Sequence, residues 1–408
     1  MSNIEIITFG CRLNSYESEV IREILTSNNI TIADDKNIVI FNSCAVTKEA
    51  ERQLQQNIRK VKKEQGNNVI IGVVGCAVQV NGDTYINMPE VDFVIGNNKK
   101  LELGSYTNIK KCNVVVDDVF KNNKSSTEII TGFENRARAF IQIQNGCDNR
   151  CTFCLTRLAR GYSVSTPSKL IVEQIKRLVD NGYREIVLTG IDITDYGKRL
   201  DENINLGKLI KKIIKETSVE RLRISSVDIA DLNDDLDEVL KYEKRLMSHI
   251  HLSLQSGDNI ILKRMLRRHT REQVFEKCNS ILNVRPEVVI GADLIAGFPT
   301  ETEEMHNNSI KIIKELPITY GHIFPYSIRP ETKAALMPQI NKQTKKRRAK
   351  ELRNEAGKNL NILKNKLKGT VQKVLVEGNR KGRLENYLQI NLPENFDDKV
   401  GEIVEVVI

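Results

Sequence analysis

Short apolar runs alternate with longer amphipathic stretches over the first third of the chain. Three apolar runs, each bounded by polar residues or glycine, lie at 4–9, 38–41 and 69–74. Stretches with apolar residues at helical spacing separate them, at 17–27 and 48–65. This β-α-β-α-β order predicts an α/β domain with a parallel, Rossmann-like sheet over residues 1–120.

The same alternation continues in the middle of the chain, over residues 137–340. The strands that we expect there are 140–144, 185–189, 221–225, 249–255, 288–296 and 321–325. Six β-α repeats predict a partial (β/α)6 barrel, with its chemistry at the carboxyl ends of the strands. The polar segment 121–136, which begins Lys-Asn-Asn-Lys-Ser-Ser, is predicted to be a linker.

Toward the C-terminus the pattern changes twice. Residues 341–367 form a polar, strongly basic stretch, predicted to be a helical connector. Residues 368–408 contain short apolar runs separated by turn sequences such as Gly378-Asn379 and Lys381-Gly382. We expect a small OB-like barrel of five strands, a shape that often binds single-stranded nucleic acid.

Charge adds to this picture because the net charge of +9 over 408 residues is concentrated near the C-terminus. Between Lys342 and Arg383 there are fifteen Lys and Arg residues against three acidic ones. A basic run alone usually marks a solvated helix face, but a small β-barrel beside it favours a nucleic-acid partner. The candidate RNA-binding residues are Lys345, Lys346, Arg347, Arg348, Lys373, Arg380, Lys381 and Arg383.

The sequence also indicates a cellular compartment. It has no run of 18 apolar residues, and residues 1–10 lack the basic and apolar regions of a secretory signal. Eight cysteines in 408 residues are too few for a disulfide-based scaffold. We therefore expect a cytoplasmic protein with no membrane contact, whose reduced thiols can bind metal.

Three of the cysteines lie within eight residues, at Cys147, Cys151 and Cys154, directly after a predicted strand. Three soft thiolates on one loop suit an iron–sulfur cluster and leave one iron without a protein ligand. The alternative is a zinc site with a fourth ligand such as Cys112 or Cys278. The spacing favours the iron–sulfur cluster, because zinc sites usually pair their cysteines as two C-x-x-C motifs.

Three further cysteines, Cys11, Cys44 and Cys76, each follow a predicted strand of the N-terminal domain. Parallel strands end at one edge of a sheet, so these distant cysteines are predicted to converge. One buried cysteine is ordinarily a packing residue, but three in the same topological position predict a second three-thiolate cluster site. Cys112 and Cys278 lack this pattern, and we interpret them as packing residues.

The C-x-x-x-C-x-x-C motif, with Phe153 before its last cysteine, resembles that of the radical SAM superfamily. The resemblance implies a [4Fe-4S] cluster whose open iron binds S-adenosylmethionine (SAM), with Phe153 against the adenine. Asp192 stands where many members carry the glutamate of a Gly-Gly-Glu motif. Taken by position, the expected cofactor-binding residues are Phe153, Gly190, Asp192, Ser226, Gln255, Ser256 and Arg267.

The whole chain resembles the methylthiotransferase branch of that superfamily, including its C-terminal TRAM barrel. Gly10-Cys11-Arg12-Leu13-Asn14, Asn42–Thr47 and Gly190-Ile191-Asp192-Ile193 are similar to the MtaB type. The resemblance implies two [4Fe-4S] clusters and two SAM molecules, with methylthiolation of C2 of N6-threonylcarbamoyladenosine (t6A) at tRNA position 37. It also implies catalytic roles for all six cluster cysteines.

The resemblance implies several partners as well. They are the tRNA anticodon loop, an electron donor such as flavodoxin or ferredoxin, and a sulfur donor; we expect a monomer. Two related substrates stay open, isopentenyl-adenosine in tRNA and an aspartate of a ribosomal protein. A more remote alternative is a zinc-stabilised RNA-binding protein without catalysis, which metal and sulfide analysis would distinguish.

Overall fold

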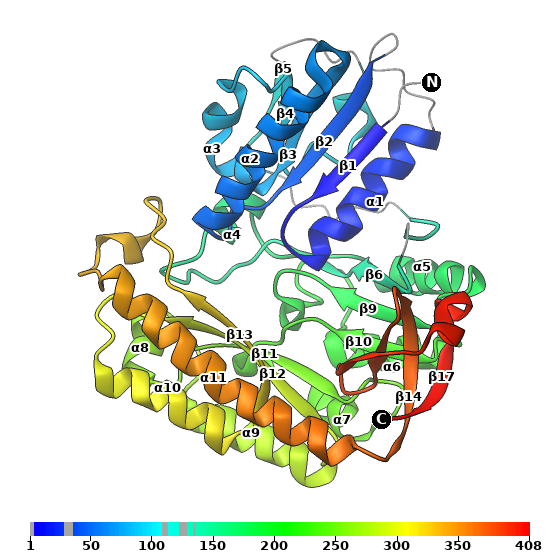
Figure 1. The fold of residues 1–408 in the computed structure, drawn as a ribbon, viewed down its shortest axis with the longest axis vertical. Helices are drawn as coiled ribbons and strands as arrows, with labels where there is room; N and C mark the ends of the chain where they lie inside the picture. The colour runs from blue at the N-terminus through cyan, green and yellow to red at the C-terminus, as the bar shows by residue number, and fades with distance from the viewer. Residues whose placement is uncertain (1–3, 28–35, 108–112, 122–128, 134–135) are drawn as a thin grey trace.

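The N-terminal part of the computed structural model is built on a five-stranded parallel sheet, shown in blue and cyan in Figure 1. Its strands, in spatial and chain order, are β1 Ile4–Thr8, β2 Asn37–Ser43, β3 Val69–Gly75, β4 Phe93–Ile95 and β5 Asn113–Val115. The structure describes residues 4–27, 36–107, 113–121, 129–133 and 136–408. Cys112 and most of the predicted linker 121–136 lie outside these ranges.

The three strands expected at 4–9, 38–41 and 69–74 are present, but a Rossmann-like order is not. Each strand pairs with the next strand along the chain, so the strand order does not reverse as it does in a Rossmann fold. Helices α1 (Arg12–Ser27) and α2 (Lys48–Gln65) pack on opposite faces of β2. Helix α3 (Cys76–Ile86) follows β3 directly.

The middle of the chain forms two three-stranded parallel sheets, of order β10-β9-β6 and β11-β12-β13. Their strands are β6 Arg138–Gln142, β9 Glu185–Thr189, β10 Arg221–Ile224, β11 His249–Gln255, β12 Val289–Ala296 and β13 Ile318–Pro325. Isolated parallel bridges, Leu222 with Leu246 and Val227 with Leu252, join the β10 and β11 sides. The six strands therefore form one curved, open array with β6 and β13 at its edges.

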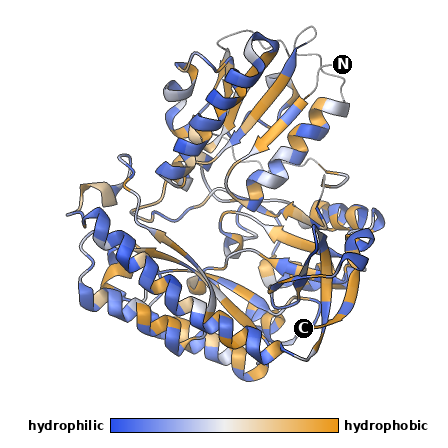
Figure 2. Ribbon diagram, viewed as in Figure 1, coloured by the Kyte–Doolittle hydropathy of each residue, from blue (hydrophilic) through white to orange (hydrophobic). Residues whose placement is uncertain are grey.

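Helices cover the outside of this array. They are α5 Ser168–Asp180, α6 Leu206–Glu216, α7 Asp234–Tyr242, α8 Asn259–Arg264, α9 Arg271–Val284 and α10 Glu303–Glu315. The short helix α4 (Thr156–Arg160) instead packs against α3 of the N-terminal part. The strands are strongly hydrophobic, whereas the helices are polar on their outer faces (Figure 2). One large apolar core lies between the two layers, and it also receives Tyr16, Val20 and Ile24 of α1.

The C-terminal segment begins with a long helix, α11 (Lys342–Leu367), which packs along β13 and α10. A four-stranded antiparallel sheet of order β16-β15-β14-β17 follows it, with β14 Val371–Gly378, β15 Lys381–Leu384, β16 Gln389–Asn391 and β17 Ile403–Val407. The expectation of five strands in residues 368–408 is wrong. A 3-10 turn at Glu394–Lys399 separates β16 from β17, which lie at opposite edges of this sheet.

This C-terminal sheet covers the amino ends of the core strands. The guanidinium of Arg221 donates to the carbonyl oxygen of Lys373 at 2.9 Å, and that of Arg223 donates to the carbonyl oxygen of Leu384 at 2.7 Å. The Tyr387 ring stacks on His249 at 4.6 Å between centroids. Among the described residues, no helix is both long and apolar enough to span a bilayer.

Candidate functional site

The cysteine loop of the core is fixed by backbone contacts. Gly146 precedes it with φ +68°, and a Cβ there would lie 1.9 Å from the carbonyl oxygen of Tyr162, so only glycine fits. The amide of Cys147 donates to Gly161 O at 3.1 Å, and the amide of Cys154 donates to Cys151 O at 3.2 Å. These bonds hold three free thiols on one short turn.

The other three cysteines come together at the carboxyl ends of β1, β2 and β3, as strand topology predicts. A Cβ on Gly10 would lie 2.8 Å from Cys44 Sγ, so the turn after β1 lies directly against this thiol. Burial raises the pKa values of both Cys11 and Cys44, and the charge of the neighbouring Cys76 adds to each shift. All three are free cysteines.

Both cysteine groups open on one cavity of about 450 Å³ between the N-terminal sheet and the core. Cys11, Cys44 and Cys76 line it from the N-terminal side, and Cys154 lines it from the core side. Four of the expected cofactor-binding residues also line the cavity: Phe153, Gly190, Ser226 and Gln255. The cavity has the size of a site for small organic molecules.

The remaining three expected cofactor-binding residues are not among those lining this cavity. Ser256 is buried and accepts a hydrogen bond from the amide of Asp258 at 3.2 Å. Asp192 accepts from Thr194 at 2.6 Å and from Asn149 at 2.8 Å. Burial first, and then neighbouring carboxylates, raise the pKa of Asp192 to about 6.

Arg267 lies next to Cys151 of the core cysteine loop. Its guanidinium forms a 2.9 Å ion pair with Asp228 and approaches Cys151 Sγ at 3.7 Å. Burial raises the pKa of Cys151, whereas the Arg267 charge lowers it. This arginine therefore stabilises a thiolate at Cys151, which is the form that binds iron.

Sequence reasoning missed several polar residues around the other thiols. Asn97 donates to Cys76 Sγ at 3.4 Å, and the Thr156 amide donates to Cys154 Sγ at 3.4 Å. Asn14, which lines the cavity, lies 3.8 Å from Cys11 Sγ. Its position three residues after Cys11 in a helix start was the one available signal for this contact.

A buried ionic network lies beside the N-terminal cysteines. Glu17 binds Lys100 at 2.7 Å and Arg160 at 2.8 Å, and the side chains of all three residues are at most 1% exposed. Arg160 also donates to Asn14 at 2.7 Å and lines the cavity. The network joins the N-terminal domain to the core, and it could not be predicted from the sequence because its members are far apart along the chain.

The structure fits the donor requirements of two iron–sulfur clusters. Each group offers three free thiols, which are soft ligands, and the seventh described cysteine, Cys278, is buried in the apolar core and belongs to neither group. Burial raises the pKa of Cys44 to about 12 and also raises that of Cys11, so cluster assembly at these thiols must release protons.

The predicted basic surface is only partly correct. Lys345 and Arg348 are buried, because Lys345 lies over the Tyr326 ring and Arg348 pairs with Glu301 at 2.9 Å. These two residues therefore do not present charge to a polyanion. Arg383 is largely buried and pairs with Glu377 at 2.7 Å.

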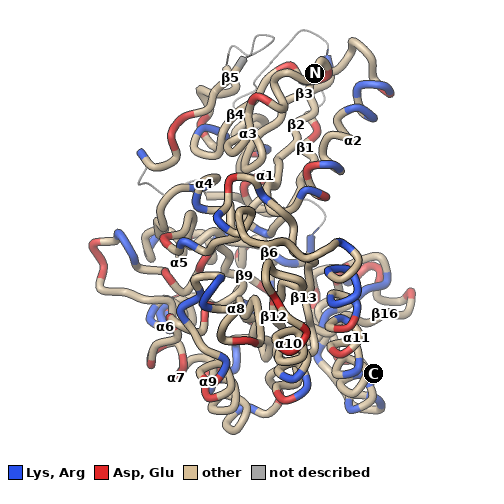
Figure 3. Tube along the Cα trace, turned by 90° about the vertical axis from the view of Figure 1, so that its left-hand side faces the viewer, with Lys and Arg blue, Asp and Glu red and all other residues tan. Residues whose placement is uncertain are grey.

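The exposed candidates among the predicted RNA-binding residues are Lys346, Arg347, Lys373, Arg380 and Lys381. Arg347 also pairs with Glu303 at 2.8 Å, and Arg380 pairs with Glu394. In the charge view of Figure 3, the tube of α11 carries both basic (blue) and acidic (red) positions. The available positive charge is therefore smaller than the sequence count suggests.

Comparisons with known proteins place this geometry in a family. Residues 141–313 match the radical SAM superfamily, and residues 3–96 match the uncharacterized protein family UPF0004. The fold resembles a solved radical SAM methyltransferase, TsrM from Kitasatospora setae, with a TM-score of 0.61 at 11% identity, over 82% of this chain and 75% of that one. Fold and cysteine loop together define a radical SAM enzyme, a class that uses SAM and a [4Fe-4S] cluster.

Curated relatives narrow the assignment. The chain is 46% identical to the threonylcarbamoyladenosine tRNA methylthiotransferase MtaB of Rickettsia prowazekii, over 98% of this chain and 93% of that one. It is 35% identical to the protein of the same name from Aquifex aeolicus, over 98% of both chains. A tRNA-2-methylthio-N(6)-dimethylallyladenosine synthase of Clostridium botulinum is 33% identical, over 99% of this chain and 92% of that one. The chain belongs to the radical SAM methylthiotransferase family, MtaB type.

Proposed function

We propose that this enzyme adds a methylthio group to C2 of N6-threonylcarbamoyladenosine at position 37 of tRNA. Cys147, Cys151 and Cys154 would hold one [4Fe-4S] cluster, and Cys11, Cys44 and Cys76 would hold a second. The observation that carries the proposal is the shared cavity, because cysteines of both groups line one chamber of about 450 Å³. The bound clusters and two SAM molecules would supply the radical and sulfur chemistry.

The chain itself would bind, orient and shield the reactants. Phe153 and Gly190 line the core side of the cavity and would contact SAM. Arg160 and Asn14 line the opposite side next to the N-terminal thiols, where the buried network would hold them in position. The exposed basic residues Lys346, Lys373 and Lys381 would contact phosphates of the anticodon stem-loop.

The first experiment separates the roles of the two cysteine groups. Purified anaerobically, the wild type should contain about eight iron and eight sulfide per chain, for two four-iron clusters. Cys151→Ala should abolish SAM cleavage, because it removes a ligand of the cluster that binds SAM. Cys44→Ala should retain SAM cleavage but transfer no sulfur to RNA.

Cys278→Ala is the matched control, because Cys278 is buried in the apolar core away from both groups. It should retain both activities and the full iron content. Stoichiometric zinc without sulfide would favour the RNA-binding alternative instead. Retention of both activities in Cys151→Ala and Cys44→Ala would contradict the assignment of the clusters.

The second experiment identifies the substrate. Nucleosides of tRNA from a strain that lacks the gene should contain t6A but not its 2-methylthio form, as measured by mass spectrometry. Persistence of 2-methylthio-t6A would rule out the proposed substrate. Loss of the methylthio derivative of isopentenyl-adenosine would assign the enzyme to the related reaction.

A further inference from the structure

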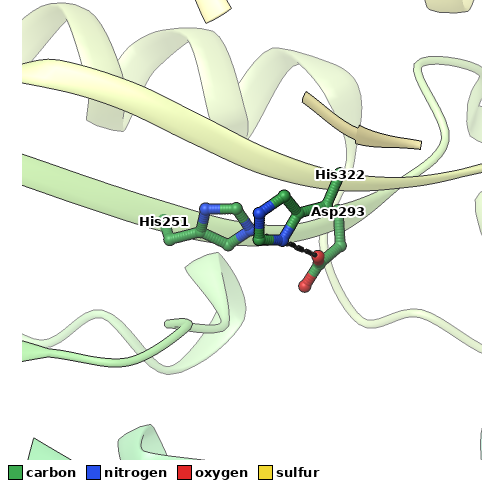
Figure 4. A group of neighbouring side chains, drawn as sticks. All are labelled: His251, Asp293 and His322. Atoms are coloured by element: carbon green, nitrogen blue, oxygen red, sulfur yellow. Dashed lines mark hydrogen bonds and ion pairs between the residues drawn. The ribbon is translucent and has the colours of Figure 1, made fainter. Parts of the chain in front are cut away.

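Two histidines and an aspartate lie side by side on the inner face of three adjacent core strands (Figure 4). His251 is on β11, Asp293 on β12 and His322 on β13. His251 Nε2 lies 3.2 Å from Asp293 Oδ1, and His322 Nδ1 lies 3.4 Å from the same oxygen. The three side chains therefore form one connected polar group.

Strand register fixes the positions of these side chains. Asp293 is paired directly with His322 in the parallel ladder, so both point to the same side. On the other strand pair, His251 lies opposite Gly291, and a Cβ at Gly291 would lie 2.4 Å from His251 Nδ1. A larger residue at position 291 would push the imidazole away from Asp293.

The group reaches the cavity that the cluster cysteines share. Asp293 lines this cavity together with Ser253 and Ile295, which lie one step further along the same face of β11 and β12. The His251 side chain is 8% exposed, that of Asp293 is 24% exposed, and that of His322 is 57% exposed. The polar group therefore runs from the buried imidazole of His251 to the accessible imidazole of His322.

The electrostatics of the group suit a polar ligand. Burial raises the pKa of Asp293, but hydrogen bonds from both histidines outweigh it and hold that pKa well below its usual range. Asp293 is thus an ionised acceptor at the cavity wall. His322 directs Nδ1 at Asp293, and Nε2 of its exposed ring faces no partner in the group; as an imidazolium, His322 would donate to both Asp293 and an anionic ligand.

We propose that His251, Asp293 and His322 form the subsite that recognises the polar N6 substituent of the substrate nucleoside. In this arrangement His322 Nε2 donates to the carboxylate of a threonylcarbamoyl group, and Asp293 accepts from its hydroxyl or N–H groups. His251 holds Asp293 in place. This inference rests on the proposed function, which it extends by naming the residues that select the substrate.

The chemistry of the rival substrate supports the choice. An isopentenyl group has no hydrogen-bonding atoms, so it would leave Asp293 and His322 desolvated without partners. A site that hydrogen-bonds its substrate rejects an apolar analogue strongly for this reason. The same three residues would therefore admit the threonylcarbamoyl group and exclude the isopentenyl group.

The test compares RNA affinity rather than turnover alone. Anticodon stem-loops carrying t6A, isopentenyl-adenosine or unmodified adenosine at position 37 are titrated anaerobically into the cluster-loaded enzyme. The wild type should bind the t6A RNA most tightly. His322→Phe and Asp293→Asn should each weaken t6A binding about 10- to 100-fold, the loss expected for hydrogen bonds to charged groups.

Affinity for the unmodified RNA should change less than about twofold in these variants, since phosphate contacts dominate it. Formation of 5′-deoxyadenosine without RNA is measured for each variant, so that a loss of t6A affinity is separated from damage to the SAM site. His322→Gln keeps a donor and should recover part of the t6A preference. His306→Gln is the matched control, because it loses an imidazole–carboxylate pair with Glu351 outside the cavity.

Three results would overturn the inference. One is equal t6A affinity in wild type and His322→Phe. Another is weakened binding of all three RNAs to the same extent. The last is one equivalent of zinc or manganese per chain in the wild type that Asp293→Asn loses, because the group would then be a metal site. A wild type that does not methylthiolate t6A RNA would instead refute the proposed function.

Discussion

Glu17 lies between two cations inside the protein, and its carboxylate has almost no contact with water. Burial raises its pKa, but the charges and hydrogen bonds of Arg160 and Lys100 outweigh burial and lower the pKa to about 2. Burial lowers the pKa of Lys100, whereas the pKa of Arg160 is raised by its anionic neighbours despite burial. Arg160 is therefore the stronger cationic partner of Glu17. One carboxylate thus neutralises a cavity-lining arginine.

Replacement of this carboxylate should be costly. Glu17→Gln keeps the shape but leaves Arg160 and Lys100 buried without a counter-charge, so the free energy of unfolding should fall by about 3–5 kcal/mol. Urea denaturation of the wild type and the variant measures the difference. The exposed pair of Glu49 with Arg52 gives the control, since solvent screens this pair and Glu49→Gln should leave the free energy of unfolding essentially unchanged.

The loss of stability in acid should also depend on Glu17. The pKa of Glu17 is lowered on folding, so its contribution is present above its unfolded pKa of 4.5 and is lost as pH falls toward about 2. About 3 kcal/mol of stability should disappear in this window in the wild type. An identical pH profile in Glu17→Gln would show that another group is responsible.

At this scale, the sequence predicted how the cysteines group but not what surrounds them. The six cysteines were recognisable because their spacing and their positions after apolar runs carry chemical meaning. Arg160, Asn97 and Asp293 were not, because each meets its partner only after strands and helices distant in sequence have packed. A single charged residue gives no local signal of burial.

Helix α11 shows the limits of charge counting at the scale of an element. Its Lys-Lys-Arg-Arg run winds around the helix, so successive residues face different directions. Lys345 and Arg348, three apart, share the face that packs on the core, whereas Lys346 and Arg347 face outward. The bounds of the helix followed from its composition, but the buried face did not, since a basic residue there breaks the usual apolar pattern.

The two faces of α11 should respond differently to mutation. Lys346→Glu should weaken tRNA binding severalfold and flatten its salt dependence, because it removes a phosphate contact. Binding titrations at several salt concentrations test this, with Lys60→Glu on α2 as the exposed control. Arg348→Ala should mainly lower the free energy of unfolding, by about 3–5 kcal/mol, because it leaves the buried Glu301 without its ion-pair partner. Equal loss of RNA affinity in Lys60→Glu and Lys346→Glu would contradict a specific role for α11.

The strands of the core and of the N-terminal sheet show a related limit of prediction from sequence patterns. Hydrophobic runs located the long buried strands of the core closely, at Glu185–Thr189 and His249–Gln255. They missed β4 and β5, which have three residues each and too little periodicity to detect. Strand order in both α/β parts depends on tertiary packing, so sequence pattern predicted parallel pairing but not the sequential order of the N-terminal sheet.

At the scale of the whole molecule, the three parts of the chain meet at Tyr387. Arg12, next to the cluster cysteine Cys11, donates to the Tyr387 hydroxyl at 2.8 Å. Four arginines lie 4.4 to 5.7 Å from its ring: Arg12, Arg138, Arg223 and Arg383. Burial raises the pKa of Tyr387, but the charges of Arg12, Arg138 and Arg383 outweigh burial and lower that pKa. One side chain of the C-terminal sheet thus contacts both other parts.

This junction gives a prediction about coupling. Tyr387→Phe keeps the stacking on His249 but removes the hydrogen bond to Arg12, which should cost about 1 kcal/mol. Amide hydrogen exchange should become faster in residues 381–391 and in the first turn of α1. Tyr242→Phe, at a side chain 66% exposed, should leave exchange unchanged. Faster exchange confined to the C-terminal sheet would show that Arg12 does not transmit the change.

The C-terminal sheet covers the amino ends of the core strands, and the cysteines lie at the other end. No residue of this sheet lines the cavity that the cysteines share. A defect confined to the sheet should therefore reach the cavity only indirectly, through the strands on which the sheet rests.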